Sequence, residues 1–359
     1  MLILAVFCLV QQAKAAQYQC TALDLPTEAS WGRAYGINDS GQVVGNAGGG
    51  EYHRGILWNG TTAAVLSLPS GAASGSALDI NDASQVAGMV TIDGDPRPVR
   101  WDAGNPTLLG LPPRPVNWGD VRAVNEAGQI AGRQQNSGSL GKYEPVRWDG
   151  SVPIELNLGP YLGGELRDIN DSANSVGSVY HATNGWQPAL WNGLDPSVLE
   201  MPDVHPVPSG HAYAINNMGQ IAGTVESSYA VRWDSGVPSI LDLPIGMWLV
   251  GVTDINDLGQ VVGSLADSSG SYPVLWNGSE PLLLPLPDGY SSGEAYGLNS
   301  SGEVVGYVWS SELDAQPARW GIVPIPSTAL LLAPGLGVLA WMRKMAKHQL
   351  GNPLHMRSN

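Results

Sequence analysis

Three aspartates stand at equivalent places in this sequence, because Asp79, Asp168 and Asp254 each come directly before Ile-Asn-Asp. Arg122 and Arg167 lie at or beside the corresponding places. Two carboxylates that face one cleft are the usual machinery of glycoside hydrolysis. If the fold gathers these segments, the sequence predicts that the five residues rim a polar channel. Three interpretations of such a channel are open. It binds a ligand, it holds only water and charges that balance one another, or its carboxylates cleave glycans.

Other chemical patterns are missing from the sequence. It contains no H-E-x-x-H, no paired cysteine motif, no G-x-S-x-G and no P-loop, which are the signatures of common metal, hydrolase and nucleotide sites. Four histidines of the body stand apart from one another: His53, His181, His205 and His211. We therefore predict no bound cofactor and no zinc site.

One segment has the beginning of a calcium loop. Asp254, Asn256 and Gly259 have a D-x-N-x-x-G spacing, but Leu258 and Leu265 stand where the fifth and twelfth ligands belong. Asn and Asp side chains bond their own backbone in turns, and glycine accepts a positive φ. The segment is interpreted as a turn, with weak calcium binding as the alternative.

These segments belong to a repeat whose clearest copy is INDSGQVVG at 37–45. Seven copies occur, 40 to 46 residues apart, and their shared asparagines are Asn38, Asn81, Asn125, Asn170, Asn216, Asn256 and Asn299. A tryptophan follows each copy: Trp58, Trp101, Trp148, Trp191, Trp233, Trp276 and Trp320. A period of this length is typical of propeller blades.

Each repeat is predicted to form four short strands. In the first repeat these are 34–37, a strand starting at 42, 55–58 and 66–69, the last being a Leu-Ser-Leu-Pro run. Asn59-Gly60 between the third and fourth is a strong hairpin signal, and it recurs as Asp149-Gly150, Asn192-Gly193 and Asn277-Gly278. Four antiparallel strands per repeat predict an all-β, seven-bladed β-propeller.

The two ends of the repeat array indicate how the ring closes. No fourth strand follows Trp320, but an unmatched Leu-Asp-Leu-Pro run stands at 23–26, before the first repeat. We expect this run to be the outer strand of the last blade, which removes exposed sheet edges. An open β-solenoid is the alternative.

The repeated aromatic residues are predicted to pack the blades together. The seven tryptophans fill the space between neighbouring blades in this interpretation, and stacking on sugars is the alternative. Tyr35, Tyr213 and Tyr296, at matching positions of the first strand, are also assigned to packing.

Over residues 32–321 the repeats resemble the HAF family of extracellular repeat proteins. The resemblance rests on the INDSGQVVG-type runs and on the tryptophan that ends the third strand. It implies secretion and a surface location, and it supplies no catalytic residues.

The N-terminus is predicted to be a signal peptide, residues 1–15. An apolar run from Leu2 to Val10 precedes Ala13-Lys14-Ala15, which fits a cleavage site. Its removal leaves the propeller, 16–321, with Cys20 as a single cysteine, so that no internal disulfide is expected.

The C-terminus is predicted to anchor the protein in a membrane. The 18 residues from Ile325 to Met342 carry no charge, and Arg343, Lys344 and Lys347 follow. This length suits a transmembrane helix, and the basic residues place the 348–359 tail in the cytoplasm.

Segment 322–347 also resembles the PEP-CTERM sorting signal of Gram-negative bacteria that carry exosortases. The matching residues are Val323, Pro324 and Pro326, then Arg343 and Lys344. The resemblance implies an exosortase-type sorting enzyme as partner, inner-membrane anchoring, and then display at the cell surface or in the matrix beside exopolysaccharide.

The charge distribution narrows the partners further. Residues 17–321 hold 11 arginines, one lysine and all 32 acids, a net charge of −20. Such a body repels phosphate backbones, so we expect no nucleic-acid partner. The expected protein is a monomeric, non-enzymatic repeat protein that binds polysaccharide or surface partners. A polysaccharide-active hydrolase or lyase is the alternative, and a purely structural repeat protein is a third.

Overall fold

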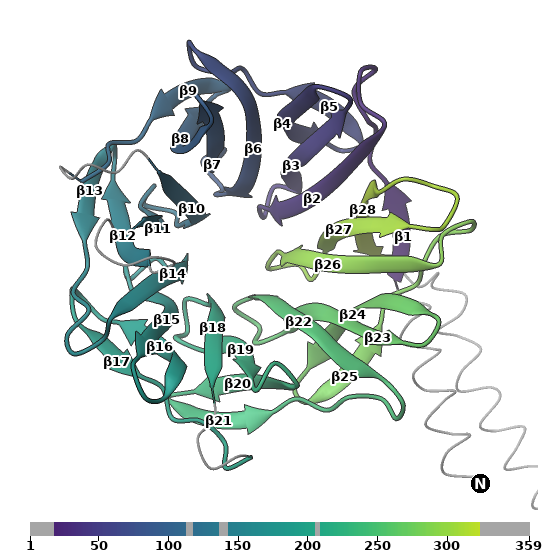
Figure 1. Ribbon diagram of the computed structural model, residues 1–359. Helices are drawn as coiled ribbons and strands as arrows, with labels where there is room; N and C mark the ends of the chain where they lie inside the picture. Colours follow the sequence, from purple (N-terminus) through teal and green to yellow (C-terminus); the bar gives the residue numbers. More distant parts are fainter. Residues whose placement is uncertain (1–17, 113–117, 136–142, 205–208, 324–359) are drawn as a thin grey trace, which may run out of the picture. The chain divides into compact units, whose positions relative to one another are not determined.

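The computed structural model describes residues 18–112, 118–135, 143–204 and 209–323. Twenty-eight strands form seven four-stranded antiparallel sheets, arranged as blades around one axis (Figure 1). The prediction of an all-β, seven-bladed propeller is therefore confirmed.

The strands have the following bounds. The innermost are β2 (Trp31–Ile37), β6 (Ala72–Ile80), β10 (Gly119–Val124), β14 (Gly163–Ile169), β18 (Gly210–Ile215), β22 (Trp248–Ile255) and β26 (Ser292–Leu298). The second are β3 (Gln42–Gly49), β7 (Gln85–Ile92), β11 (Ile130–Gln135), β15 (Ser175–His181), β19 (Ile221–Val225), β23 (Val261–Asp267) and β27 (Val304–Trp309). The third are β4 (Tyr52–Asn59), β8 (Asp95–Asp102), β12 (Tyr143–Asp149), β16 (Gly185–Trp191), β20 (Tyr229–Asp234), β24 (Gly270–Asn277) and β28 (Gln316–Ile322). The outermost are β5 (Thr62–Val65), β9 (Asn105–Leu108), β13 (Val152–Glu155), β17 (Pro196–Val198), β21 (Val237–Ile240), β25 (Glu280–Leu283) and β1 (Tyr18–Ala22). Blades are numbered 1 to 7 in the order of these innermost strands.

The N-terminal strand closes the ring, as predicted, because blade 7 has the strand order β1-β28-β27-β26. Tyr18 of β1 is buried against Trp320 and donates a hydrogen bond to the carbonyl of Gly302, at 3.1 Å. The first and last parts of the propeller sequence thus share one sheet, so that blade 7 has no unpaired strand between its neighbours.

The position of the outer strand differs from the prediction. The closing strand is β1 rather than 23–26, and the outer strand of blade 1 is β5 rather than 66–69. Each Leu-x-Leu-Pro-type run instead follows the outer strand and connects it to the next blade. Its first leucine is buried, as Leu23 and Leu66 show, and proline cannot extend the ladder because it has no N–H.

These connectors are fixed by the repeated tryptophans. In every blade the indole Nε1 donates to the carbonyl of the residue after the first connector leucine, at 2.5–3.1 Å. The pairs are Trp58–Asp24, Trp101–Ser67, Trp148–Gly110, Trp191–Asn157, Trp233–Glu200, Trp276–Asp242 and Trp320–Pro285. A buried indole needs such an acceptor, so each tryptophan joins its blade to the preceding one.

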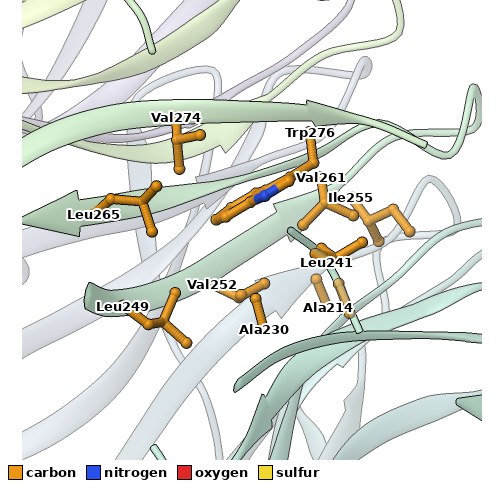
Figure 2. Close-up of a cluster of buried hydrophobic side chains, with 11 residues drawn as sticks. Ala214, Ala230, Leu241, Leu249, Val252, Ile255, Val261, Leu265, Val274 and Trp276 are labelled. Atoms are coloured by element: carbon orange, nitrogen blue, oxygen red, sulfur yellow. The ribbon is translucent and has the colours of Figure 1, made fainter. Parts of the chain in front are cut away.

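The core lies between the blades. All seven tryptophans are 0% exposed, which confirms their predicted packing role. Figure 2 shows Trp276 among aliphatic side chains of β22–β24, with Ala214 and Ala230 from the preceding blade and Leu241 from the connector. Similar clusters fill the other interfaces.

The repeated asparagines form a closed ring at the ends of the inner strands. Each Nδ2 donates to the backbone carbonyl of the next asparagine, at 2.8–3.3 Å, in the order Asn38, Asn81, Asn125, Asn170, Asn216, Asn256, Asn299 and back to Asn38. Each Oδ1 also accepts the backbone N–H four residues later. In each repeat, the asparagine side chain thus accepts a backbone N–H of its own turn and joins its blade to the next one.

Several predicted features lie outside the described residues. These are the signal peptide, Pro324, Pro326, Arg343 and Lys344 of the sorting motif, the membrane helix and the tail; only Val323 of that motif is described. The chain divides into a compact unit ending at Gly321 and a second unit, Ile322–Asn359. Within the described part of the chain, no helix has the length and apolarity to cross a membrane.

Candidate functional site

A β-bulge in the inner strand of every blade builds the wall of a central cavity. In each blade the pairing with the second strand skips the residue that stands three places before the shared asparagine, and a bulge turns such a residue out of the ladder. Blades 2 and 6 skip a second residue nearer the start of the strand, Ala73 and Val250. The residues skipped at the shared position are Tyr35, Leu78, Arg122, Arg167, Tyr213, Thr253 and Tyr296. All seven line one cavity of about 540 Å³.

The last glycine of the repeat makes this bulge possible. A Cβ on Gly132 would lie 2.1 Å from the carbonyl oxygen of Asp120, and one on Gly177 would lie 1.9 Å from that of Glu165. Both glycines are on the second strand, opposite the bulge. The corresponding glycines of the remaining five blades would have similar contacts, at 1.9–2.2 Å. The repeated glycine therefore has a steric role beside the turn itself.

All five residues predicted to rim a channel line this cavity. Arg122 and Arg167 are bulge residues, and Asp79, Asp168 and Asp254 follow the bulges of blades 2, 4 and 6. The tyrosines Tyr35, Tyr213 and Tyr296 were assigned to packing, but they also line the cavity. The signal that identifies them is their place two residues before the Ile-Asn or Leu-Asn of the repeat.

The three aspartates join neighbouring blades. Asp79 accepts the backbone N–H of Ile80 through Oδ1 and that of Val124, in the next blade, through Oδ2, both at 2.8 Å. Asp168 accepts from Ile169 and Ile215, and Asp254 from Ile255 and Leu298, all at 2.7 Å. Each carboxylate thus uses both oxygens on backbone donors.

Small residues alternate with these aspartates around the axis. The equivalent positions from blade 1 to blade 7 are Gly36, Asp79, Ala123, Asp168, Ala214, Asp254 and Gly297. A Cβ on Gly36 would lie 3.0 Å from Oδ1 of Asp79, and one on Gly297 would lie 2.6 Å from the carbonyl oxygen of Tyr35. Blades 1 and 7 therefore have little room for a side chain at this position.

Burial raises the pKa of all three carboxyls: Asp79 to about 7, Asp168 to about 6 and Asp254 to about 8. Repulsion from Asp168 raises the pKa of Asp79 and of Asp254 further, while the backbone N–H donors lower all three. Because they influence one another, the carboxyls titrate as a group.

A second group of charges spans blades 3 and 4. Asp120 is paired with Arg122 and Arg133, and Glu165 with Arg133 and Arg167. The Arg133–Asp120 distance is 3.2 Å and the shortest Arg167–Glu165 distance is 2.6 Å. Both acids are almost fully buried, at 2% and 3% exposure. Burial alone would raise the pKa of Glu165, but Arg167 and Arg133 hold it below its ordinary value.

This charge group is not balanced. Three arginines face two acids, and Nε of Arg122 and Oδ1 of Asp120 are buried without a hydrogen-bond partner among the described residues. Burial lowers the pKa of Arg122, Asp120 raises it, and Arg167 and Arg133 lower it again. This charge group therefore carries one more positive than negative charge, and two of its arginines line the cavity.

Aromatic residues outside the repeat pattern gather where the inner strands begin, which we call the entrance end. Trp31 and Trp248 start β2 and β22, and Trp118 precedes β10. Trp309 pairs with Ser292 at the start of β26, and Trp186 pairs with Tyr180, which lies opposite the start of β14. None of the five is fully buried, and Trp248 is 55% exposed. The asparagine ring lies at the opposite ends of these strands.

The chain matches no protein-family model and no curated protein. Solved structures are similar to it. A streptogramin B lyase matches with a TM-score of 0.57 and 11% identity over 85% of this chain and 98% of that one. The β-propeller domain of the Trilobed protease from Pyrococcus furiosus, with an open velcro topology, gives 0.53 and 12% over 82% and 94%. YCF48 bound to D1 peptide gives 0.51 and 11% over 86% and 97%. At this identity the similarity shows the fold alone, and by fold this chain is a seven-bladed β-propeller.

Proposed function

We propose that this protein is an exported, non-enzymatic propeller that binds a polysaccharide, or another partner in the exopolysaccharide layer, through its central cavity. The observation that carries the proposal is the set of side chains that the bulges turn into the cavity. Three are tyrosines and two are arginines, which are residues suited to binding rather than to bond cleavage.

Saccharides match this chemistry. A sugar ring has apolar C–H faces, which pack on aromatic rings, and hydroxyls, which need hydrogen-bond partners. Tyr35 and Tyr296 contact edge to face, with ring centroids 5.3 Å apart, and the cavity volume of about 540 Å³ is in the usual range for ligand sites. The tryptophans of the entrance end extend the aromatic surface beyond the cavity.

The arrangement of the aspartates favours binding over cleavage. A general acid must hold a proton within reach of the glycosidic oxygen. Asp79, Asp168 and Asp254 direct both oxygens at backbone N–H groups. A hydrolase or lyase remains the second candidate, because a pKa of about 6 to 8 suits acid–base catalysis near neutral pH.

The proposed location rests on the sequence. Residues 1–15 direct export, and 322–347 anchor the protein in the inner membrane of a Gram-negative bacterium until an exosortase-type enzyme sorts it to the surface or matrix. The repeats, with their resemblance to the HAF family, agree with an extracellular location.

One experiment tests this proposal against the enzyme alternative. The purified full-length protein is incubated with the exopolysaccharide of its host and with a glycan panel, and bound glycan and new reducing or unsaturated ends are measured together. We expect binding without product, and weaker binding in Tyr213→Ala and Trp248→Ala. New ends that disappear in Asp79→Asn, Asp168→Asn or Asp254→Asn would show an enzyme, and no glycan binding at all would overturn the proposal.

A further inference from the structure

We infer that the saccharide bound in the cavity is acidic and that Arg122 and Arg167 hold its anionic group. This inference rests on the proposed function and adds the chemical class of the ligand. It also divides the five rim residues into two roles: the arginines bind the ligand, and the aspartates join the blades.

The charge excess between blades 3 and 4 is the first argument. Arg133 bonds both buried acids and stacks on Tyr143, with its guanidinium carbon 3.9 Å from the ring centroid. Arg133 is not among the residues that line the cavity, whereas Arg122, which pairs with Asp120, and Arg167, which pairs with Glu165, line it. The three arginines share only two acids, and an unbalanced, partly buried positive charge is costly. An anionic ligand would supply the missing negative charge.

The position of the two arginines is the second argument. They are the bulge residues of adjacent inner strands, β10 and β14, so that they lie side by side on the cavity wall. Each repels the other, as the effect of Arg167 on the pKa of Arg122 indicates. A carboxylate or sulfate between two guanidinium groups would relieve this repulsion and accept hydrogen bonds from both.

The neighbouring blade provides a surface for the sugar ring. The guanidinium carbon of Arg167 lies 5.5 Å from the ring centroid of Tyr213, the bulge residue of blade 5. An acidic sugar carries its anionic group and its apolar ring face on one residue, which fits an arginine pair beside a tyrosine. The net charge of −20 between residues 17 and 321 does not prevent this contact, because exposed charges farther than about 8 Å are screened at physiological salt. The acids that line the same cavity have donors of their own: the three aspartates accept backbone N–H groups, and Glu294 accepts the hydroxyls of Tyr296 and Tyr307.

The test uses the full-length protein and matched oligosaccharides in isothermal titration calorimetry. The ligands are an oligouronate, the same oligomer with its carboxylates reduced to hydroxymethyl groups, and a sulfated neutral oligomer of equal length. The variants are Arg122→Gln and Arg167→Gln. Arg100→Gln is the matched control, because Arg100 pairs with Asp102 on the third strand of blade 2 and does not line the cavity.

We expect the oligouronate or the sulfated oligomer to bind, the better one identifying the anion, and the reduced oligomer to bind at least about tenfold more weakly. Each cavity variant should weaken binding by a similar factor, and the control should not. Equal binding of charged and reduced oligomers to the wild type, with no dependence on salt, would overturn this inference but leave the proposed function intact. This comparison needs no variant, so it decides the matter even if an arginine variant does not fold. No binding of any oligomer or of host polysaccharide would overturn both.

Discussion

The two ends of the propeller are built from different kinds of residue. At the end where the inner strands finish, every repeat places the same asparagine, and the seven side chains bond one another in a ring. At the entrance end the first residue of the inner strand differs between blades, for example Trp31 in blade 1, Ala72 in blade 2 and Ser292 in blade 7. Between the two ends, every blade has a bulge at the same place, but its side chain varies among tyrosine, arginine, leucine and threonine.

This difference indicates that one set of residues stabilises the ring of blades and another set binds the ligand. The repeated Asn, Gly and Trp residues satisfy turns, permit the bulge and join the blades, so they are equivalent in all seven blades. Asp79, Asp168 and Asp254 also join blades, but the other residues that differ between blades gather around one cavity and its entrance. The predictions below test whether stability belongs to the first set and binding to the second.

The largest contrast is expected between two tryptophans of blade 6. Trp276 is fully buried and bonds the Asp242 carbonyl, whereas Trp248 is 55% exposed. Trp276→Ala should lower the free energy of unfolding by about 3–5 kcal/mol, and Trp248→Ala by less than about 1 kcal/mol. Chemical denaturation measures both values. Similar losses in the two variants would break the division between the ends.

A pair of glycines in the same blade gives the next largest contrast. A Cβ on Gly263 would lie 2.2 Å from the Gly251 carbonyl oxygen, whereas one on Gly251 would meet nothing within 4 Å. Gly263→Ala should therefore cost about 1–3 kcal/mol or more, and Gly251→Ala should stay within about 0.5 kcal/mol. Thermal unfolding would show this difference, and a harmless Gly263→Ala would refute the steric role of the repeated glycine.

The asparagine ring is expected to contribute less per residue. Asn216 donates to the Asn256 carbonyl at 2.8 Å and accepts from the N–H of Gln220 at 2.9 Å. Asn216→Ala leaves the Gln220 N–H without its acceptor and removes one of the two donors to the Asn256 carbonyl, which keeps the Gly259 N–H, so it should cost about 1–3 kcal/mol. Ser74→Ala near the entrance end is the control, with a change below about 0.5 kcal/mol. If denaturant unfolding gives the two variants equal stability, the ring has no structural role.

The three aspartates are expected to make the stability of the protein depend on pH. The pKa of Asp79, Asp168 and Asp254 is raised to about 7, 6 and 8, while unfolded aspartates titrate near pH 4. Between about pH 4 and 8 the folded protein holds protons that the unfolded chain has lost. The contribution of these groups to the free energy of unfolding therefore falls as pH rises from about 4 to 8.

Asp254→Asn removes one of these titrating groups and should flatten that profile. Unfolding curves at several pH values, recorded for the wild type and the variant, measure the difference. A stability difference that does not change between pH 4 and 8 would contradict the raised pKa of Asp254.

Most of the fold could be predicted from the repeats. A fixed spacing of Asn and Trp predicts blades because each repeat must bury the same residues against its neighbours. The outer strand was misplaced because Leu66 and Leu68 alternate like a strand, although both belong to the connector to the next blade. In the structure β5 ends at Val65, and the Ser67 carbonyl accepts the indole N–H of Trp101, which cannot be read from alternation.

The candidate site was only partly visible in the sequence. Asp79, Asp168 and Asp254 stood out because they sit beside the motif, and Arg122 and Arg167 because they are charged. The tyrosines and Thr253 were missed as lining residues. In a regular strand, successive side chains point to opposite faces of the sheet, so the sequence alone does not place these residues in the cavity wall. The bulge in each inner strand places them there.

The most direct test of the division between the two ends is hydrogen exchange of the full-length protein with and without the host exopolysaccharide. We predict added protection at the entrance end, at the starts of β2, β10 and β22, and no change in the turns that follow Asn38 to Asn299 in the ring. Protection confined to those turns would place binding at the repeated end and contradict the account.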